Sequence, residues 1–175
     1  MKKSLFAMLL VAAFSLTGCS FFGEEPAPQP PAPAPQMVSY LVYRADATGS
    51  EKLVPEEITI EANDKSLAEN ALRSLIYTAP ASAGMARVCP PEVELLDFRV
   101  DENGTAYVNF SKEIVKRSQG SYNEIMLTGA IVNTLTEFPN IHRVQLLVEG
   151  EKVITLYGHL DVEDPLERNE TLLKK

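Results

Sequence analysis

The side chains best suited to metal binding or acid–base catalysis lie in the last third of the chain. They are His142 and His159, the two histidines of the sequence, with the carboxylates of Glu149 and Asp161 near them. Imidazole and carboxylate groups suit zinc, and the two histidines with Asp161 are also the parts of a simple hydrolase. The chain has no HxxxH or CxxC spacing. This favours exposed histidines at strand ends, and we expect no metal site and no catalytic residues.

Two other side chains have the chemistry of a nucleophile. Ser111 follows an apolar strand, but no GxSxG motif surrounds it and the N-cap of a helix explains it. Cys89 stands in an apolar segment before Pro90 and Pro91. The pattern favours a small buried residue, although an intermolecular disulfide outside the cytoplasm stays open. We therefore expect neither an enzyme nor a cofactor.

The remaining polar motifs have simple explanations. The acidic pairs lie in a proline-rich segment or in turns, where carboxylates are usually solvated, and the Asn-x-Ser/Thr triplets would carry glycans only in a eukaryotic secreted protein. The formal net charge of −8 excludes nucleic acid as a main partner. The pairs are Glu24-Glu25, Glu56-Glu57 and Asp101-Glu102, and the triplets begin at Asn103, Asn109 and Asn169.

The N-terminus predicts the compartment. Lys2 and Lys3 precede a short apolar run that ends in Leu-Thr-Gly-Cys at position 19, which resembles the lipobox of bacterial lipoproteins. Residues 1–18 would be the signal peptide, and Cys19 would become the N-terminus, lipidated with palmitate and anchored in the membrane. Ser20 resembles the outer-membrane sorting pattern of two-membrane bacteria. Loss of both lysines takes the formal charge from −8 to −10.

A proline-rich tether follows the lipidated cysteine. Residues 19–36 include six prolines between Pro26 and Pro35, which exclude a helix and favour polyproline II. At ~3.1 Å per residue, residues 24–36 span about 40 Å. The tether therefore acts as a spacer between the membrane and a folded domain at 37–168, and 169–175 is a charged tail.

The elements of the domain alternate between strands and helices. Ser66 and Glu69 form a capping box at the start of one helix, and Asn103-Gly104 is a strong hairpin signal. These patterns predict an α+β fold, a mixed or mostly antiparallel sheet of about 4–6 strands with two main helices packed on one face. We expect strands near 37–44, 52–62, 96–101, 106–110, 143–149 and 153–157, helices near 66–79 and 121–138, a helical turn at 111–117, and a tail over 161–175 that frays except near Leu166.

The segment from Ser121 to Gly150 is the centre of the predicted core. Its helix carries two charges, Glu124 and Glu137, and its apolar residues spread around most of the circumference, so it is buried on more than one side. Thr128-Gly129-Ala130 permits close approach by another backbone. We expect the apolar surface that the sheet leaves uncovered to pack on the helix at Leu67–Ile76. The alternative is a partner protein.

Residues 37–168 resemble the GerMN domain of bacterial sporulation and spore-germination proteins, in a single copy. The resemblance is carried by LRSLIYTAP at 72–80 with Gly84 and Pro90-Pro91, by YVNFS at 107–111, by TLTEFP at 134–139, by VQLLVEG at 144–150 and by PLER at 165–168. It implies an extracytoplasmic interaction domain without enzymatic activity, similar to modules that build rings or scaffolds through helix-to-sheet contacts. Family members are linked to the assembly of envelope complexes during spore formation.

Two binding functions follow. The first is a membrane-anchored, non-enzymatic scaffold or assembly factor that binds envelope proteins, with self-association left open. The second is a lipoprotein that binds peptidoglycan or another ligand in a groove with exposed aromatic residues. The chain has no tryptophan for sugar stacking; the tyrosines on predicted strands are Tyr40, Tyr43, Tyr107 and Tyr157.

Overall fold

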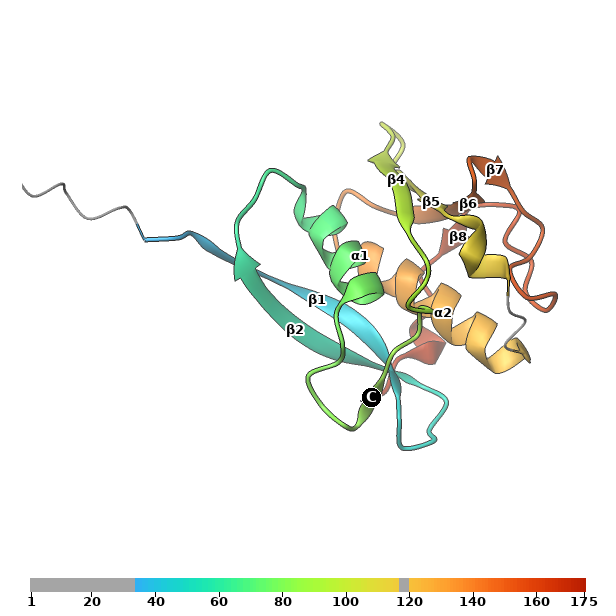
Figure 1. Ribbon diagram of the computed structural model, residues 1–175, viewed down its shortest axis with the longest axis horizontal. Coiled ribbons are helices and arrows are strands. Elements are labelled where there is room, and N and C mark those ends of the chain that lie inside the picture. The colour runs from blue at the N-terminus through green and yellow to red at the C-terminus, as the bar shows by residue number, and fades with distance from the viewer. Residues whose placement is uncertain (1–33, 117–119) are drawn as a thin grey trace, which may run out of the picture. The chain divides into compact units, whose positions relative to one another are not determined.

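The computed structural model describes residues 34–116 and 120–175 (Figure 1). The predicted signal peptide, Cys19 and nearly all of the tether lie outside the described residues. The part from Pro35 to Lys175 is one compact unit.

The first sheet is built on a long hairpin. β1 (Met37–Asp46) pairs antiparallel with β2 (Leu53–Glu61) along its length and with the short β3 (Met85–Ala86) at its end, in the order β2-β1-β3. Asp46 N donates to Lys52 O at 2.8 Å. Because hydrogen-bonded pairs alternate along an antiparallel ladder, this bond directs the backbone of Pro55 away from β1. The proline therefore costs the sheet no hydrogen bond.

The second sheet contains five strands and one parallel pair. β4 (Leu95–Val100) and β5 (Thr105–Phe110) form an antiparallel hairpin, and β5 runs parallel to β6 (Arg143–Val148). The short strands β7 (Glu151–Lys152) and β8 (Leu166–Glu167) both pair antiparallel with β6. At the β4–β5 turn, Asp101 Oδ1 accepts from the backbone N–H groups of Asn103 and Thr105, both at 2.9 Å.

Two main helices fill the space between the sheets. α1 (Leu67–Tyr77) begins at Ser66, whose hydroxyl accepts from Glu69 N at 3.1 Å. α2 (Gly120–Leu135) connects the parallel strands β5 and β6, after the 3-10 turn η1 (Lys112–Val115). No helix in the described parts of the chain is both long and apolar enough to span a membrane. A second 3-10 turn, η2 (Glu170–Leu172), lies near the C-terminus.

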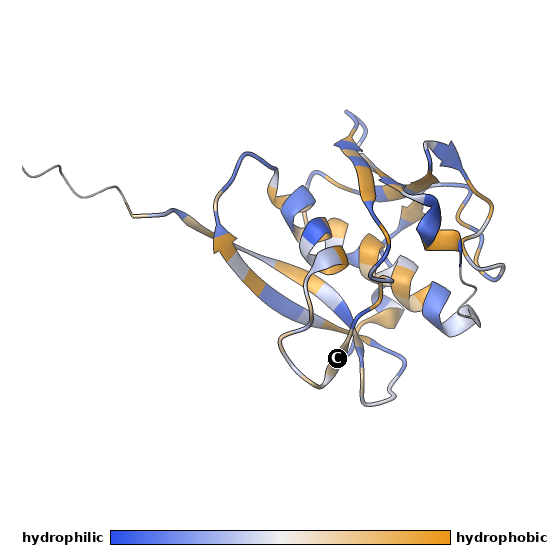
Figure 2. Cartoon of the chain, viewed as in Figure 1, coloured by the Kyte–Doolittle hydropathy of each residue, from blue (hydrophilic) through white to orange (hydrophobic). Residues whose placement is uncertain are grey.

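The core surrounds α2. This helix packs against β1, α1 and β6, and its hydrophobic residues extend along its central turns (Figure 2). Both sheets and both helices contribute to one large cluster that includes Phe110, Leu127 and Leu146, all fully buried. The predicted packing of α2 on α1 is confirmed.

A buried ion pair holds the end of α1 to the first sheet. Arg44 on β1 is completely buried, and its Nε lies 2.7 Å from Glu56 Oε2. Its two other nitrogens donate to the carbonyl oxygens of Ser74, Leu75 and Thr78 at 3.0–3.2 Å. The guanidinium therefore satisfies the carbonyl groups of Leu75 and Thr78 at the helix end and adds a donor to Ser74 O, which already accepts from Thr78 N. Glu56, expected to be a solvated acid, is instead the buried counterion of Arg44.

The predicted α+β class, its mostly antiparallel pairing and its two main helices are confirmed, with the strands divided between two sheets. Three local predictions are wrong. Leu96 alternates with Phe98 and Val100 in the sequence and was expected on the same face of the strand, but it is 46% exposed because the register shifts between Leu95 and Asp97. Residues 153–157 are a loop, because Glu124 holds their backbone (below). The C-terminal residues do not fray, because Leu173 bridges to Leu53 and Lys52 Nζ donates to Thr171 O at 2.7 Å.

Candidate interaction surface

The residues considered for a metal or hydrolase site do not form one. His142 packs beside Gly104 at the β4–β5 turn, whereas His159 lies in the loop after β7 and donates its backbone N–H to Glu124. Asp161 accepts from Glu163 N at 3.0 Å. Across the described ranges, no group of three or more His, Cys, Asp or Glu side chains is placed to hold a metal ion. Both histidines are exposed, as predicted.

The two candidate nucleophiles, Ser111 and Cys89, both have roles in holding the fold together. Ser111 stands at the N-cap of η1, but its hydroxyl accepts from Glu94 N at 3.1 Å and not from the turn. Cys89 is 3% exposed. Burial raises the pKa of its thiol to about 12, and the opposing effect of Arg87 is smaller. The thiol is therefore protonated and inaccessible at neutral pH, as expected of a small core residue.

Glu124 has a structural role that sequence reasoning missed. This fully buried carboxylate on α2 accepts five hydrogen bonds from the loop after β7. Oε1 accepts from the Thr155 hydroxyl at 2.7 Å and from the backbone N–H groups of Leu156 and Tyr157 at 2.8 Å. Oε2 accepts from the backbone N–H groups of His159 and Leu160 at 2.8 and 3.2 Å. The sequence signal that could have indicated this role is Glu124 itself, the one acidic residue in a helix that is mostly buried.

The hydrogen bonds to Glu124 also decide its ionisation. Burial of the carboxyl opposes ionisation, but the Thr155 hydroxyl and the backbone N–H groups outweigh it and lower its pKa. The backbone N–H groups of Leu156 and Tyr157, which were expected to bond to a neighbouring strand, donate instead to this ionised carboxylate. Within this loop Leu156 and Tyr157 are buried in the core, whereas Ile154 is 66% exposed.

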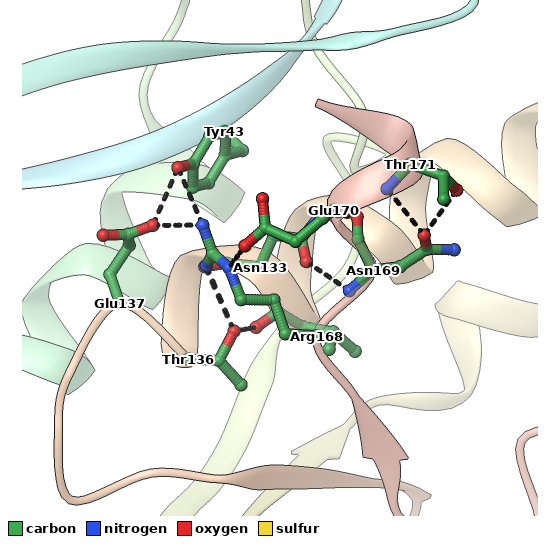
Figure 3. A network of polar contacts seen from close by, with 9 residues as sticks. Tyr43, Asn133, Thr136, Glu137, Arg168, Asn169, Glu170 and Thr171 are labelled. Carbon is green, nitrogen blue, oxygen red and sulfur yellow. Dashed lines mark hydrogen bonds and ion pairs between the residues drawn. The ribbon is translucent and has the colours of Figure 1, made fainter. Parts of the chain in front are cut away.

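A second polar cluster fastens the C-terminal segment to α2 and β1 (Figure 3). Arg168 points between Tyr43 and Glu137, donating to the Glu137 carboxylate at 2.6 Å and to the Tyr43 hydroxyl at 3.2 Å. It also donates to Asn133 O at 2.9 Å, and Asn133 Oδ1 accepts from Asn169 N at 2.9 Å. Because these partners come from three elements, the cluster joins the two ends of the domain.

The residues after Arg168 cover the small-residue stretch of α2. A Cβ added at Gly129 would collide with Leu172 Cδ1, so the glycine admits a leucine side chain of the C-terminal segment. Beside this contact lies an apolar groove of about 270 Å³, lined by Ile125, Thr128 and Leu166 among others. The close approach that the sequence predicts at Thr128-Gly129-Ala130 is therefore made by the chain's own C-terminus.

The larger groove, of about 550 Å³, lies between the start of α1 and β4. Its apolar surface comes from Leu67, Phe98, Val100 and Phe138, and its rim carries Lys65, Asp64 and Glu69. Leu67 is 43% exposed. At the other end of β4, Leu95 N donates to the Tyr77 hydroxyl at 2.7 Å and joins the strand to the end of α1. The groove therefore lies beside the C-terminal half of β4, an edge strand of the second sheet.

The tyrosines considered for glycan stacking are poorly placed for it. Tyr40, Tyr43 and Tyr157 are buried. Tyr107 is half-buried, and the Arg99 guanidinium lies over its ring at 3.6 Å from the centroid. Neither large groove is lined by these four rings.

The comparisons with known structures agree with this fold. Similar structures include the tandem GerMN domains of the sporulation protein GerM from Bacillus subtilis, with a TM-score of 0.65 and 23% identity over 75% of this chain and 46% of that chain. The first GerMN domain of GerM gives 0.62 and 24%, over 75% and 98%. A putative lipoprotein from Clostridium perfringens gives 0.53 and 26%, over 75% and 87%. No curated protein matches the chain.

The share of each solved structure that is covered shows how many domains the matched part corresponds to. It spans less than half of the tandem-domain structure and nearly the whole of the single-domain structure, so the matched part corresponds to one GerMN domain. The family model named Germane, described as sporulation and spore germination, matches residues 41–154, well over half of the sequence. The protein therefore belongs to the Germane family of sporulation and spore-germination proteins.

Proposed function

We propose that the protein is a lipid-anchored envelope lipoprotein that acts as a scaffold or assembly factor through its GerMN domain. The observation that carries the proposal is the combination of a family match over residues 41–154 with a lipobox-like sequence ending at Cys19. Lipidation at Cys19 would hold the protein on the outer side of the cytoplasmic membrane, or on the outer membrane where one exists. The proline-rich residues 19–36 would hold the domain away from the bilayer.

The domain suits protein binding better than catalysis. Its conspicuous polar clusters, around Arg44, Glu124 and Arg168, are internal: their partners are backbone groups and side chains of the same domain. The groove beside β4 combines an apolar surface with a mixed charged rim, a composition common in protein interfaces. The family is one of sporulation-related domains, not a known enzyme family. Sporulation or germination is accordingly the process in which we place the protein.

Crosslinked affinity capture from intact envelopes tests the scaffold role. The full-length protein should return specific envelope proteins, and a matched variant that keeps residues 1–36 but lacks the domain should not. Residues 1–36 retain the lipobox and tether in both samples, so membrane proximity is the same. An identical set of captured proteins from both would contradict the proposal.

The anchor is tested separately by Cys19→Ala. The thiol is the atom that lipidation requires, so the variant should lose metabolic labelling by palmitate and either leave the membrane fraction or stay unprocessed. Cys89→Ala is the matched control, because Cys89 is a buried core residue and the change should leave labelling intact. Unchanged labelling of Cys19→Ala would refute the lipoprotein assignment.

A further inference from the structure

β4 has a free edge, and residues at this edge line the large groove. The strand pairs on one side only, with β5. Asp101 N donates to Thr105 O at 3.0 Å, and bonded pairs alternate along an antiparallel ladder. The register therefore turns the N–H and C=O groups of Phe98 and Val100 away from β5. Among the described residues, none of these four groups has a hydrogen-bond partner.

The edges of β2 and β4 differ in the residues whose backbone groups face outward. On β2, the outward-facing backbone belongs to Pro55, Glu57 and Glu61 among others. Proline has no N–H group to offer, and charges on an edge strand discourage another chain from pairing there. On β4, the outward-facing backbone belongs to a phenylalanine and a valine. An exposed edge of this kind is the feature to which an extended segment adds in strand augmentation.

The side chains at this edge provide the specificity pockets that strand addition needs. Phe98 and Val100 project from one face of β4 and are partly buried against the core, and with Leu67 and Phe138 they line the groove. Side chains of an added strand alternate between its two faces. Every second side chain of such a strand would enter the apolar groove, and the others would lie on the charged face of the sheet.

The charged face of β4 decides between a second copy of this chain and another protein. Asp97, Arg99 and Asp101 alternate with the groove residues. A symmetric antiparallel pair centred on Arg99 would place Arg99 opposite itself and each Asp97 opposite Asp101 of the other copy. Like charges directly opposite each other destabilise a strand pair. Arg99 is already stacked on Tyr107, and Asp101 already accepts from Asn103 N, Thr105 N and the Tyr107 hydroxyl. The exposed carboxylate of Asp97 therefore favours a basic residue on the incoming strand.

We infer that the free edge of β4 binds an extended segment of a partner protein, apolar at every second residue and carrying lysine or arginine between them. The segment adds as a strand at Phe98 and Val100, with its apolar side chains in the groove beside α1. This inference rests on the proposed scaffold function and names the surface and the class of partner. Tyr77, bonded to Leu95 N at 2.7 Å, limits the added strand at its other end.

The direct test is selection of peptides on the full-length protein in detergent. The probe is a displayed library of random eight-residue peptides. Selected sequences should alternate apolar and polar residues with an excess of lysine and arginine, and they should protect the amides of Phe98 and Val100 from hydrogen exchange. No enrichment, or protection confined to other elements, would overturn the inference.

Two changes separate strand addition from other contacts at the groove. Val100→Pro removes an outward N–H that makes no bond inside the domain, and should weaken the selected peptides about tenfold or more. Glu57→Pro makes the same change on the edge of β2 and should leave binding unaltered. N-methylation of alternate peptide residues gives a test that leaves the protein unchanged: one set of methylated positions should abolish binding and the other should not. Equal binding in all forms would contradict strand addition.

The outcome also distinguishes this inference from the scaffold function. If envelope capture depends on the domain while the peptide results fail, another surface binds the partner and only the β4 assignment is wrong. If wild-type protein self-associates and Val100→Pro abolishes that association, the occupant is a second copy and the inferred partner class is wrong. If capture does not depend on the domain, the scaffold function itself fails.

Discussion

Glu124→Gln is the sharpest test of the carboxylate that organises the loop after β7. The change keeps the size of the side chain but replaces one acceptor oxygen by an NH₂ group. The remaining oxygen can still accept from Thr155, Leu156 and Tyr157, as Oε1 does now at 2.7–2.8 Å. The NH₂ group would then face the backbone N–H groups of His159 and Leu160, so two donors would lose their acceptor.

The expected cost follows from those two donors. Leaving a buried donor without an acceptor costs roughly 1–3 kcal/mol, and hydrogen bonds to a charged group lie at the upper end. Glu124→Gln should therefore reduce the free energy of unfolding by about 2–4 kcal/mol and the midpoint temperature by about 5–15 °C. Glu151→Gln, an exposed carboxylate on β7, is the matched control and should change stability by less than about 0.5 kcal/mol.

The pH dependence gives an independent check with a defined sign. The pKa of Glu124 is lowered in the folded protein from its ordinary value of 4.5. Its contribution is therefore fully present above the unfolded pKa and is lost as the pH falls through the folded pKa. The stability difference between wild type and Glu124→Gln should be constant near neutral pH and should shrink below about pH 4.5.

Urea denaturation followed by circular dichroism, repeated across the acid range, measures both quantities. Hydrogen exchange should also rise in residues 153–162 of the variant before it rises in the two sheets. A variant within about 0.5 kcal/mol of wild type at neutral pH, or a difference that grows in acid, would refute the assigned role.

Two further predictions concern Arg168 and Cys89. Arg168→Ala should lower the free energy of unfolding by about 1–3 kcal/mol and make the C-terminal segment sensitive to proteolysis, because it removes the bonds to Asn133 O and to Glu137. Arg168→Lys keeps the charge without the planar fork and should restore less than half of the loss. Full rescue by lysine would show that charge alone matters. Cys89, with its thiol pKa raised to about 12 by burial, should resist alkylation at neutral pH in the native protein and react fully in denaturant, and rapid native labelling would contradict its buried placement.

The parts of the fold that follow from local patterns could be predicted from the sequence. Ser66 and the apolar spacing after it define α1, and Asn103-Gly104 defines the β4–β5 hairpin, because capping and turn geometry depend on a few neighbouring residues. The burial of α2 on several sides follows from its composition. The division of the strands into two sheets depends on contacts between distant residues and has no local signal.

Most of the wrong predictions concern residues that are held by long-range polar contacts. Residues 153–157 have the β-branched and aromatic composition of a strand, but the carboxylate of Glu124, about thirty residues earlier, accepts from the N–H groups of Leu156 and Tyr157. The charged tail has the composition of a solvated segment, yet Arg168 donates to Tyr43 on β1, 125 residues earlier in the chain. The tertiary fold determines which groups pair with a buried carboxylate or guanidinium. Composition predicts only that a buried charge will be paired. Leu96 differs, because a bulge in its own hairpin turns it outward.

The covering of α2 bears on where a partner can bind. Most of its apolar surface is shared among β1, α1, β6 and the C-terminal segment. Ile125 remains 36% exposed beside the smaller apolar groove. A larger interface on α2 would require displacement of Leu172 and of the Arg168 cluster. Strand addition at β4 requires no displacement, because Phe98 and Val100 already present unpaired backbone groups beside an open groove.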